Sequence, residues 1–257
     1  MIEKLKNTYW KFREIMPSLV DRLKADPPLR CLDRFVKTRC RHTLWINDIA
    51  IRLAPGMGSA AVAYILDGRY ERPERRILEY ALKAGDRVLE LGTGIGYLSA
   101  FCARKIGSDR VITFEANPLL RPRIEETYFI NEVSPQVEFC MLGEHAGQAS
   151  FYVGDEFWSS STISRKGKER RISIPVKAFN DILDEHKPNF LIIDIEGGEA
   201  DLIDFMRLDG VTKVCIELHP WVIGKESEKR VRDFFHSHGF KEDPVVSDEE
   251  HVLYQRN

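Results

Sequence analysis

Short apolar segments alternate regularly with amphipathic ones from about Gly85 onward, and this alternation is the feature that most constrains the fold. The apolar segments predict strands, and the segments with apolar residues three and four apart predict helices. The expected strands are residues 87–91, 110–114, 136–142, 190–195 and 213–218, with short candidates in 240–255. The expected helices are 97–106, 118–130, 178–186, 199–208 and 226–238. This order predicts a doubly wound α/β domain, a parallel sheet covered on both faces that binds ligands beyond the carboxyl ends of its strands. Residues 149–153 and 172–176 are expected to pair as an antiparallel hairpin.

The segment before this alternation has a different character. Helices are expected at 3–24, 29–37, 59–66 and 73–82, and a strand or hairpin at 43–53. We therefore predict a mostly helical extension over 1–72 and a main domain over 73–257. The extension is a candidate either to cover a substrate site or to form a homo-oligomer.

Composition indicates a globular protein. The 257 residues include 38 Lys and Arg against 40 Asp and Glu, so the formal net charge is −2 and gives no global attraction to nucleic acid or membrane. No apolar run approaches the roughly 20 residues that span a bilayer. The first residues lack an apolar signal-peptide core, so we expect a cytoplasmic protein. Five cysteines without a Cys-x-x-Cys pair indicate reduced, buried thiols.

A glycine-rich turn follows the first strand of the main domain. Gly92, Gly94 and Gly96, with Thr93 between the first two, separate that strand from the next helix. Glycine permits a positive φ and a close ligand approach. The dinucleotide-binding fingerprint Gly-x-Gly-x-x-Gly would need a glycine at position 97, where this chain has tyrosine. The carboxylate of Glu90 would repel a pyrophosphate but would attract an ammonium group.

Glu115 ends the second strand, 19 residues after Gly96 in the chain. In nucleotide-binding folds a carboxylate about 20 residues beyond the glycines accepts hydrogen bonds from both ribose hydroxyls. A ligand with a ribose and an ammonium group but no pyrophosphate is S-adenosylmethionine. The alternative is that Glu115 only caps the helix that starts near Pro118.

Further motifs join these two. They are Gly68-Arg69-Tyr70-Glu71, Phe114-Glu115-Ala116-Asn117-Pro118, Asn131, Asp194-Ile195-Glu196-Gly197-Gly198-Glu199 and Ile216-Glu217-Leu218-His219-Pro220. With them, residues 66–220 resemble the FkbM family of class I S-adenosylmethionine-dependent methyltransferases. The resemblance implies a Rossmann-like seven-stranded sheet, S-adenosylmethionine as cofactor, and methylation of a hydroxyl on a sugar or small metabolite. Ile195, Gly198 and Glu90 are mild departures from the usual family pattern.

Candidate catalytic residues lie at the ends of the last two parallel strands. Asp194 and Glu196 follow one strand, and His219 follows the next. Crowded carboxylates can raise one pKa enough for a base, or hold a divalent metal ion. Glu196 could instead face solvent, and His219 could instead cap a loop. Tyr70 and Glu144 are further candidates for cofactor contact, the latter near the adenine.

Two other functions stay open at this point. The basic segment 165–171 favours a nucleic-acid methyltransferase that acts on RNA, although the amine-directed Asn-Pro-Pro-Tyr motif is absent. A non-catalytic binding protein could keep the same fold. In the same loop, Trp158 and the hydroxyl-bearing residues 159–162 suit either sugar stacking or a simple anchor.

Overall fold

The computed structural model describes residues 42–53, 57, 59–153 and 170–256. The helices expected at 3–24 and 29–37, the loop containing Trp158 and most of the basic segment 165–171 lie outside these residues. The chain forms two compact units, of which the first ends at Arg72 and the second begins at Pro73. In the first unit, β1 (Thr43–Ile46) and β2 (Ile49–Arg52) form an antiparallel hairpin, followed by α4 (Ser59–Leu66). Asn47 has φ 53° in the hairpin turn, a conformation that asparagine tolerates well.

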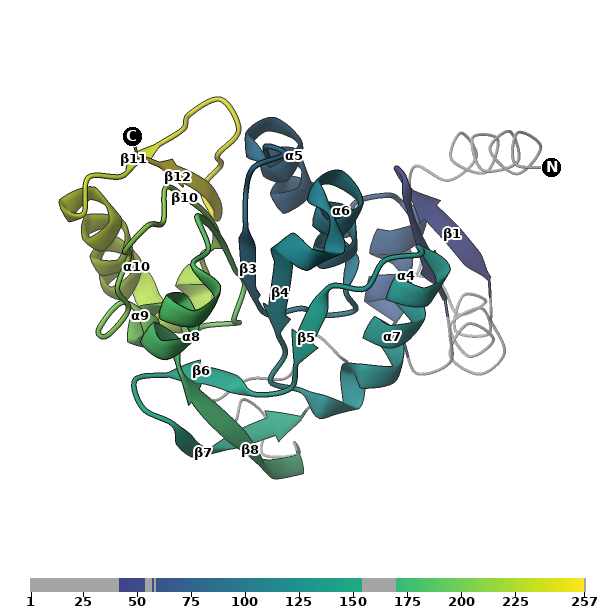
Figure 1. Cartoon of the computed structure of the whole chain (residues 1–257), viewed down its shortest axis with the longest axis horizontal. Helices are drawn as coiled ribbons and strands as arrows, with labels where there is room; N and C mark the ends of the chain where they lie inside the picture. Colours follow the sequence, from purple (N-terminus) through teal and green to yellow (C-terminus); the bar gives the residue numbers. More distant parts are fainter. Residues whose placement is uncertain (1–41, 54–56, 58, 154–169, 257) are drawn as a thin grey trace. The chain divides into compact units, whose positions relative to one another are not determined.

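The second unit contains a seven-stranded sheet of order β11-β12-β10-β9-β3-β4-β5 (Figure 1). Its strands are β3 (Val88–Leu91), β4 (Val111–Phe114), β5 (Gln136–Glu138), β9 (Phe190–Ile193), β10 (Lys213–Glu217), β11 (Lys241–Glu242) and β12 (His251–Gln255). The five strands from β10 to β5 are parallel, whereas β12 runs antiparallel to both of its neighbours. This arrangement confirms the predicted doubly wound, seven-stranded α/β fold.

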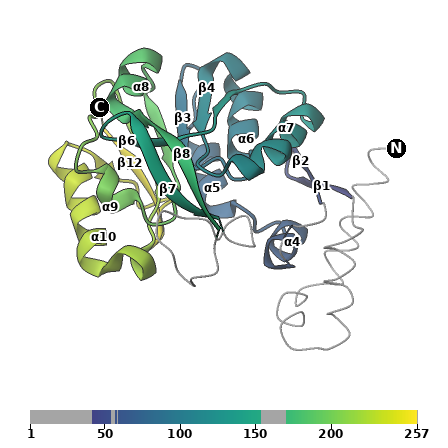
Figure 2. The ribbon, with the colours of Figure 1, turned by 90° about the horizontal axis from the view of Figure 1, so that it is seen from below.

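Helices cover both faces of this sheet (Figure 2). Alternate strand residues, such as Leu89, Ile112 and Leu191, pack in one core with α8 (Phe179–His186), α9 (Glu199–Leu202) and α10 (Pro220–Ser237). The residues between them, Glu90 and Thr113 included, face the side of α6 (Tyr97–Ile106). The remaining helical segments are α5 (Arg72–Ala81), α7 (Arg121–Ile130) and the short η1 (Ser108–Arg110) and η2 (Pro118–Leu120).

A separate three-stranded sheet, of order β6-β8-β7, lies at the lower end of Figure 1. It contains β6 (Met141–Gly143), β7 (Gly147–Val153) and β8 (Arg170–Ala178). The predicted hairpin is confirmed, since β7 and β8 pair antiparallel. The single strand expected over 136–142 is wrong. Its first half pairs with β4 and its second half pairs with β8, a partner about 35 residues later that no local periodicity reveals.

Two helix boundaries also differ from the prediction. The helix expected over 199–208 is regular only to Leu202, and the last helix starts at Pro220 rather than near 226. Proline fits the first turn of a helix because its missing N–H needs no partner there. Gly224 then interrupts α10 with φ 80°.

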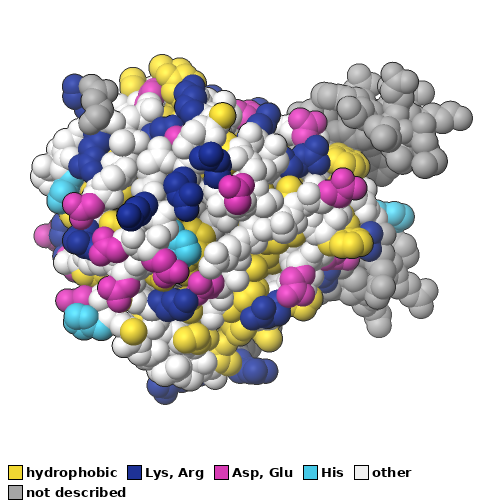
Figure 3. All heavy atoms as spheres, viewed as in Figure 1, with side chains coloured by type: hydrophobic (Ala, Val, Ile, Leu, Met, Phe, Trp, Pro, Cys, Tyr) yellow, Lys and Arg dark blue, Asp and Glu magenta, His cyan; other side chains and the backbone are white. Residues whose placement is uncertain are grey.

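The three cysteines in the described residues, Cys102, Cys140 and Cys215, are buried and free, as predicted for reduced thiols. Within the described part of the chain, no helix is long and apolar enough to cross a membrane. On the face shown in Figure 3, basic and acidic side chains are interspersed.

Candidate functional site

The glycine turn lies directly against the ends of β4 and β9. The Gly92 amide donates a 2.9 Å hydrogen bond to the Phe114 carbonyl, and the Asp194 amide donates one of 2.9 Å to Leu91. Gly92 has φ +89°, and a Cβ there would lie 1.7 Å from the carbonyl oxygen of Asp194. Only glycine fits this position, because the backbone of Asp194, directly after β9, occupies the space that a side chain would need.

Glu90 lies buried beneath this turn, with 1% of its surface exposed. The Thr113 hydroxyl donates a 2.6 Å hydrogen bond to Oε2, and the hydroxyls of Thr113 and Thr93 are hydrogen-bonded to each other. Oε1 is buried and has no hydrogen-bond partner among the described residues. Burial raises the pKa of Glu90 from 4.5 to about 8, although the bond from Thr113 opposes the shift. Ser99 in α6 also lowers that pKa, and an ammonium group bound at Oε1 would lower it further.

Glu115 is held by the backbone at the end of β4. Its carboxylate accepts hydrogen bonds from the amides of Gly94, at 2.9 Å, and Asn117, at 2.7 Å. Burial raises its pKa to about 7, while these amide bonds lower it. The helical segment at Pro118 is capped by Asn117, whose side chain accepts from Leu119, so that capping role does not fall to Glu115. The carboxylate is thus tied to the glycine turn.

Four carboxylates surround the imidazole of His219. The residue is 2% exposed, and Nδ1 of its ring lies 2.8 Å from Oε1 of Glu199. Its Nε2 lies 3.8 Å from Asp194 Oδ1, 4.0 Å from Glu196 Oε2 and 3.6 Å from Glu217 Oε1. The segments that follow β9 and β10 therefore bring together the three predicted catalytic residues, because these parallel neighbouring strands end at the same edge of the sheet.

The electrostatics of this cluster favour a positive charge. Burial lowers the pKa of His219, but the hydrogen bond to Glu199 and the charges of Glu199, Glu217 and Glu196 outweigh it, so the pKa is raised. His219 is therefore more protonated near neutral pH than an ordinary histidine. Trp221 packs edge-on against His219, with ring centroids 5.7 Å apart, and is 64% exposed.

Two other residues, Glu144 and Tyr70, were also predicted to contact the cofactor. Glu144 follows β6 of the small sheet, and its side chain is 66% exposed beside His145. Tyr70 belongs to the first unit, where its amide donates to the Tyr64 carbonyl. Their contacts with a cofactor stay predictions.

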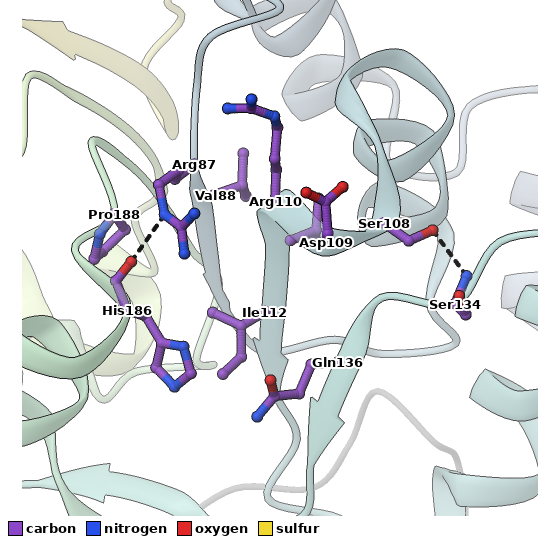
Figure 4. Close-up of a pocket in the computed structure, with 11 residues that line it drawn as sticks. Arg87, Val88, Ser108, Asp109, Arg110, Ile112, Ser134, Gln136, His186 and Pro188 are labelled. Carbon is purple, nitrogen blue, oxygen red and sulfur yellow. Dashed lines mark hydrogen bonds between the residues drawn. The ribbon is translucent and has the colours of Figure 1, made fainter.

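A pocket of about 160 Å³ lies at the opposite edge of the sheet, where the parallel strands begin (Figure 4). Arg87, Arg110 and Gln136 line it, together with His186, whose carbonyl accepts from Arg87 Nε at 3.0 Å. Ligands of doubly wound sheets bind at the carboxyl ends of the strands, so this pocket is not the candidate site.

More than half of the chain matches one known family of protein domains. A model of the methyltransferase FkbM domain matches residues 90–242, which is more than half of the chain and includes the glycine turn, Glu115 and the His219 cluster. The chain belongs to the FkbM methyltransferase family. The resemblance drawn from the sequence is confirmed, and S-adenosylmethionine is the cofactor.

The similarity of this chain to individual proteins is weaker or covers a shorter part of the chain. The chain is 30% identical over 73 residues to "Protein-lysine N-methyltransferase EFM3" from Chaetomium thermophilum, a match that spans 28% of this chain and 22% of that protein. A solved structure of Pyrococcus abyssi tRNA (uracil-54, C5)-methyltransferase with S-adenosyl-L-homocysteine is 14% identical with a TM-score of 0.48, and the match covers 84% of this chain and 43% of that one. Cofactor-bound Rv0187 from MTB is 16% identical with a TM-score of 0.43, over 72% of this chain and 79% of that one.

Sequence reasoning missed part of this region. Glu74, Asp248 and His251 join Glu217 in a second cluster beside the first, with His251 Nε2 3.6 Å from Glu217 Oε1. Glu74 sits in an ordinary amphipathic helix, and no spacing in the chain links it to a histidine 177 positions later. The pairing of β12 beside β10 places His251 opposite Glu217, and α5 adds Glu74.

Proposed function

We propose that this FkbM-family protein transfers a methyl group from S-adenosylmethionine to a hydroxyl of a sugar or small metabolite. The observation that carries the proposal is the backbone contact between the glycine turn and the acidic end of β9. Gly92 leaves no space for a side chain against the Asp194 carbonyl. The residues proposed for the cofactor and those proposed for the acceptor therefore adjoin, as an in-line transfer requires.

On the cofactor side, Glu115 is proposed to accept hydrogen bonds from the ribose hydroxyls. Each carboxylate oxygen can accept more than one hydrogen bond, so its bonds to the amides of Gly94 and Asn117 leave capacity for a diol. Oε1 of Glu90 is proposed to accept from the ammonium group. The backbone of the glycine turn is proposed to contact the cofactor at Gly92, Thr93, Gly94 and Gly96. Tyr70 and Glu144 are proposed as further contacts with the cofactor.

On the acceptor side, Asp194 and Glu196 are proposed to receive the hydroxyl proton. Their side chains are 23% and 28% exposed, whereas the side chain of His219 is 3% exposed. His219 is the least accessible of the three and is in contact with all the carboxylates of the cluster, so its proposed role is to hold them in place. When bound, S-adenosylmethionine supplies an electrophilic methyl group. A carboxylate that accepts the hydroxyl proton makes the acceptor oxygen a stronger nucleophile.

Trp221 supports a carbohydrate or similarly amphipathic acceptor. Its ring is exposed and lies against His219. An indole offers a flat apolar surface that suits the C–H face of a sugar, while the neighbouring carboxylates suit its hydroxyls.

An amine acceptor is the second candidate. Four carboxylates around one imidazole leave an excess of negative charge, which attracts a cation. The short match to a protein-lysine N-methyltransferase agrees with such an acceptor. An RNA acceptor was favoured only by the basic segment 165–171, of which residues 165–169 lie outside the described residues. Arg171 in β8 is hydrogen-bonded to Ser150.

Calorimetric titration with S-adenosylmethionine and S-adenosylhomocysteine tests the cofactor roles. A hydrogen bond to a charged group contributes about 1.5–3 kcal/mol, so Glu115→Ala should weaken binding about 10- to 150-fold. Glu125→Ala is a matched control, because that carboxylate is exposed and forms a long surface ion pair with Arg121, at 3.9 Å. Equal affinity of both variants would refute the role of Glu115.

Transfer of labelled methyl to pooled hydroxylated sugars, hydroxylated metabolites and primary amines then tests the acceptor class. Nuclear magnetic resonance of the product distinguishes an O-methyl from an N-methyl group. O-methyl product supports the proposal, and N-methyl product establishes the second candidate. Tight cofactor binding without transfer to any pool would favour the non-catalytic binding protein.

A further inference from the structure

His251 lies among carboxylates from three separate elements of the second unit. Its Nε2 is 3.2 Å from Glu74 Oε1 in α5 and 3.6 Å from Glu217 Oε1 at the end of β10. Its Nδ1 is 2.9 Å from Asp248 Oδ1, in the loop before β12. Glu74, Asp248 and His251 take no part in the proposed methyl transfer.

The hydrogen bond to Asp248 fixes the orientation of the imidazole. Nε2 is directed at Glu74 and Glu217. Burial lowers the pKa of His251, but the hydrogen bonds to Glu217 and Glu74 outweigh it and raise the pKa to about 11, so Nε2 carries a proton that a bound metal ion would displace. Histidines that bind metal ions are oriented in this way by a carboxylate on the other ring nitrogen. One ligand atom each from Glu74, Glu217 and His251 lie within 4.8 Å of one another, close enough to share one ion.

A buried oxygen of Glu74 independently points to a cation. Glu74 is 3% exposed, and its Oε2 has no hydrogen-bond partner among the described residues. A buried carboxylate oxygen without a donor is unfavourable, because it has lost its water and gained nothing in return. A cation between the carboxylates would satisfy it. The side chain of Glu217 is 24% exposed and gives an ion a path from solvent.

We propose that Glu74, Glu217 and His251 bind a divalent transition-metal ion, with Asp248 orienting the histidine. One imidazole nitrogen and two carboxylates suit Zn²⁺ or Mn²⁺ better than the all-oxygen ions Mg²⁺ and Ca²⁺. The ion would tie α5 to β10 and β12, beside the His219 cluster that shares Glu217. This proposal does not depend on the acceptor or on methyl transfer.

Metal content of the full chain tests the site. Protein stripped with EDTA is dialysed against Zn²⁺ or Mn²⁺ alone and separated from free ion. Its metal content per chain is then measured by inductively coupled plasma mass spectrometry. We expect about one ion per chain in the wild type and loss of that ion in His251→Gln and Glu74→Gln. Asp248→Asn should weaken affinity about 10- to 100-fold. His145→Gln is the control and should retain the ion, because its side chain is 85% exposed.

Co²⁺ absorption provides a second readout, since a bound imidazole changes the visible spectrum. Circular dichroism confirms that each variant is folded before its metal content is compared. Failure of folded wild type to retain either ion would overturn the proposal and leave the cluster as a network of salt bridges. Retention by His251→Gln with loss by His219→Gln would also overturn it, by placing the ion among Asp194, Glu217 and His219.

Discussion

An alanine at position 92 would bring its Cβ to 1.7 Å from the Asp194 carbonyl oxygen, at a residue with φ +89°. Two costs follow. A non-glycine residue in the left-handed region costs about 1–2 kcal/mol. Overpacking against a backbone that cannot rotate away costs about 1–3 kcal/mol more. We therefore expect Gly92→Ala to lower the free energy of unfolding by about 2–5 kcal/mol.

Two other glycines separate these costs. Gly239 has φ +81°, and a Cβ added there would meet nothing within 4 Å, so Gly239→Ala carries only the conformational cost, about 1–2 kcal/mol. Gly85 also has open space and no positive φ, so Gly85→Ala should change stability by less than about 0.5 kcal/mol. The series thus isolates the contact with Asp194.

Urea unfolding followed by circular dichroism gives the three free energies, and calorimetry gives the affinity for S-adenosylmethionine. We expect Gly92→Ala to be the least stable of the three and to bind the cofactor more weakly than Gly239→Ala. If Gly92→Ala and Gly239→Ala unfold at the same urea concentration, the close contact between the turn and β9 does not constrain the fold, and the reasoning fails.

Three further predictions concern single side chains. Asp194→Asn should reduce methyl transfer about 10²- to 10⁴-fold with little change in cofactor affinity, and unchanged turnover would remove Asp194 as the base. The folded pKa of Glu90 is about 8 against 4.5, so wild-type stability falls as pH rises through this interval. Glu90→Gln, which can still accept from Thr113, should therefore become more stable relative to wild type between pH 5 and 8 in thermal unfolding, and a constant difference would contradict this. Lys213 donates to Asp86 at 2.6 Å in a nearly buried pair. Lys213→Met should cost about 3–5 kcal/mol in urea unfolding, part of which Asp86→Asn should restore, and a cost below about 1 kcal/mol would contradict a tightly coupled pair.

Local pattern was enough for most of the fold. The strand-turn-helix unit around Gly92 was predictable because buried strands, positive-φ glycines and amphipathic helices each leave a signal within about ten residues. The positions of Glu115 and Asp194 at strand ends followed from the same signals. Boundaries were less predictable where partners compete, as in residues 136–142, which divide between two sheets.

The candidate site at the carboxyl edge of the sheet was likewise predictable only in part. The sequence by itself determined which residues end the parallel strands, and so that Asp194 and His219 would lie at one edge. Only the tertiary structure decided their environment: that Glu199 rather than solvent meets Nδ1 of His219, and that His219 is buried and its pKa raised. It also decided that Glu74 meets His251, since antiparallel β12 returns that histidine to the edge where β10 ends. The physical reason is that burial and charge depend on neighbours in space, which strand order fixes and local sequence does not record.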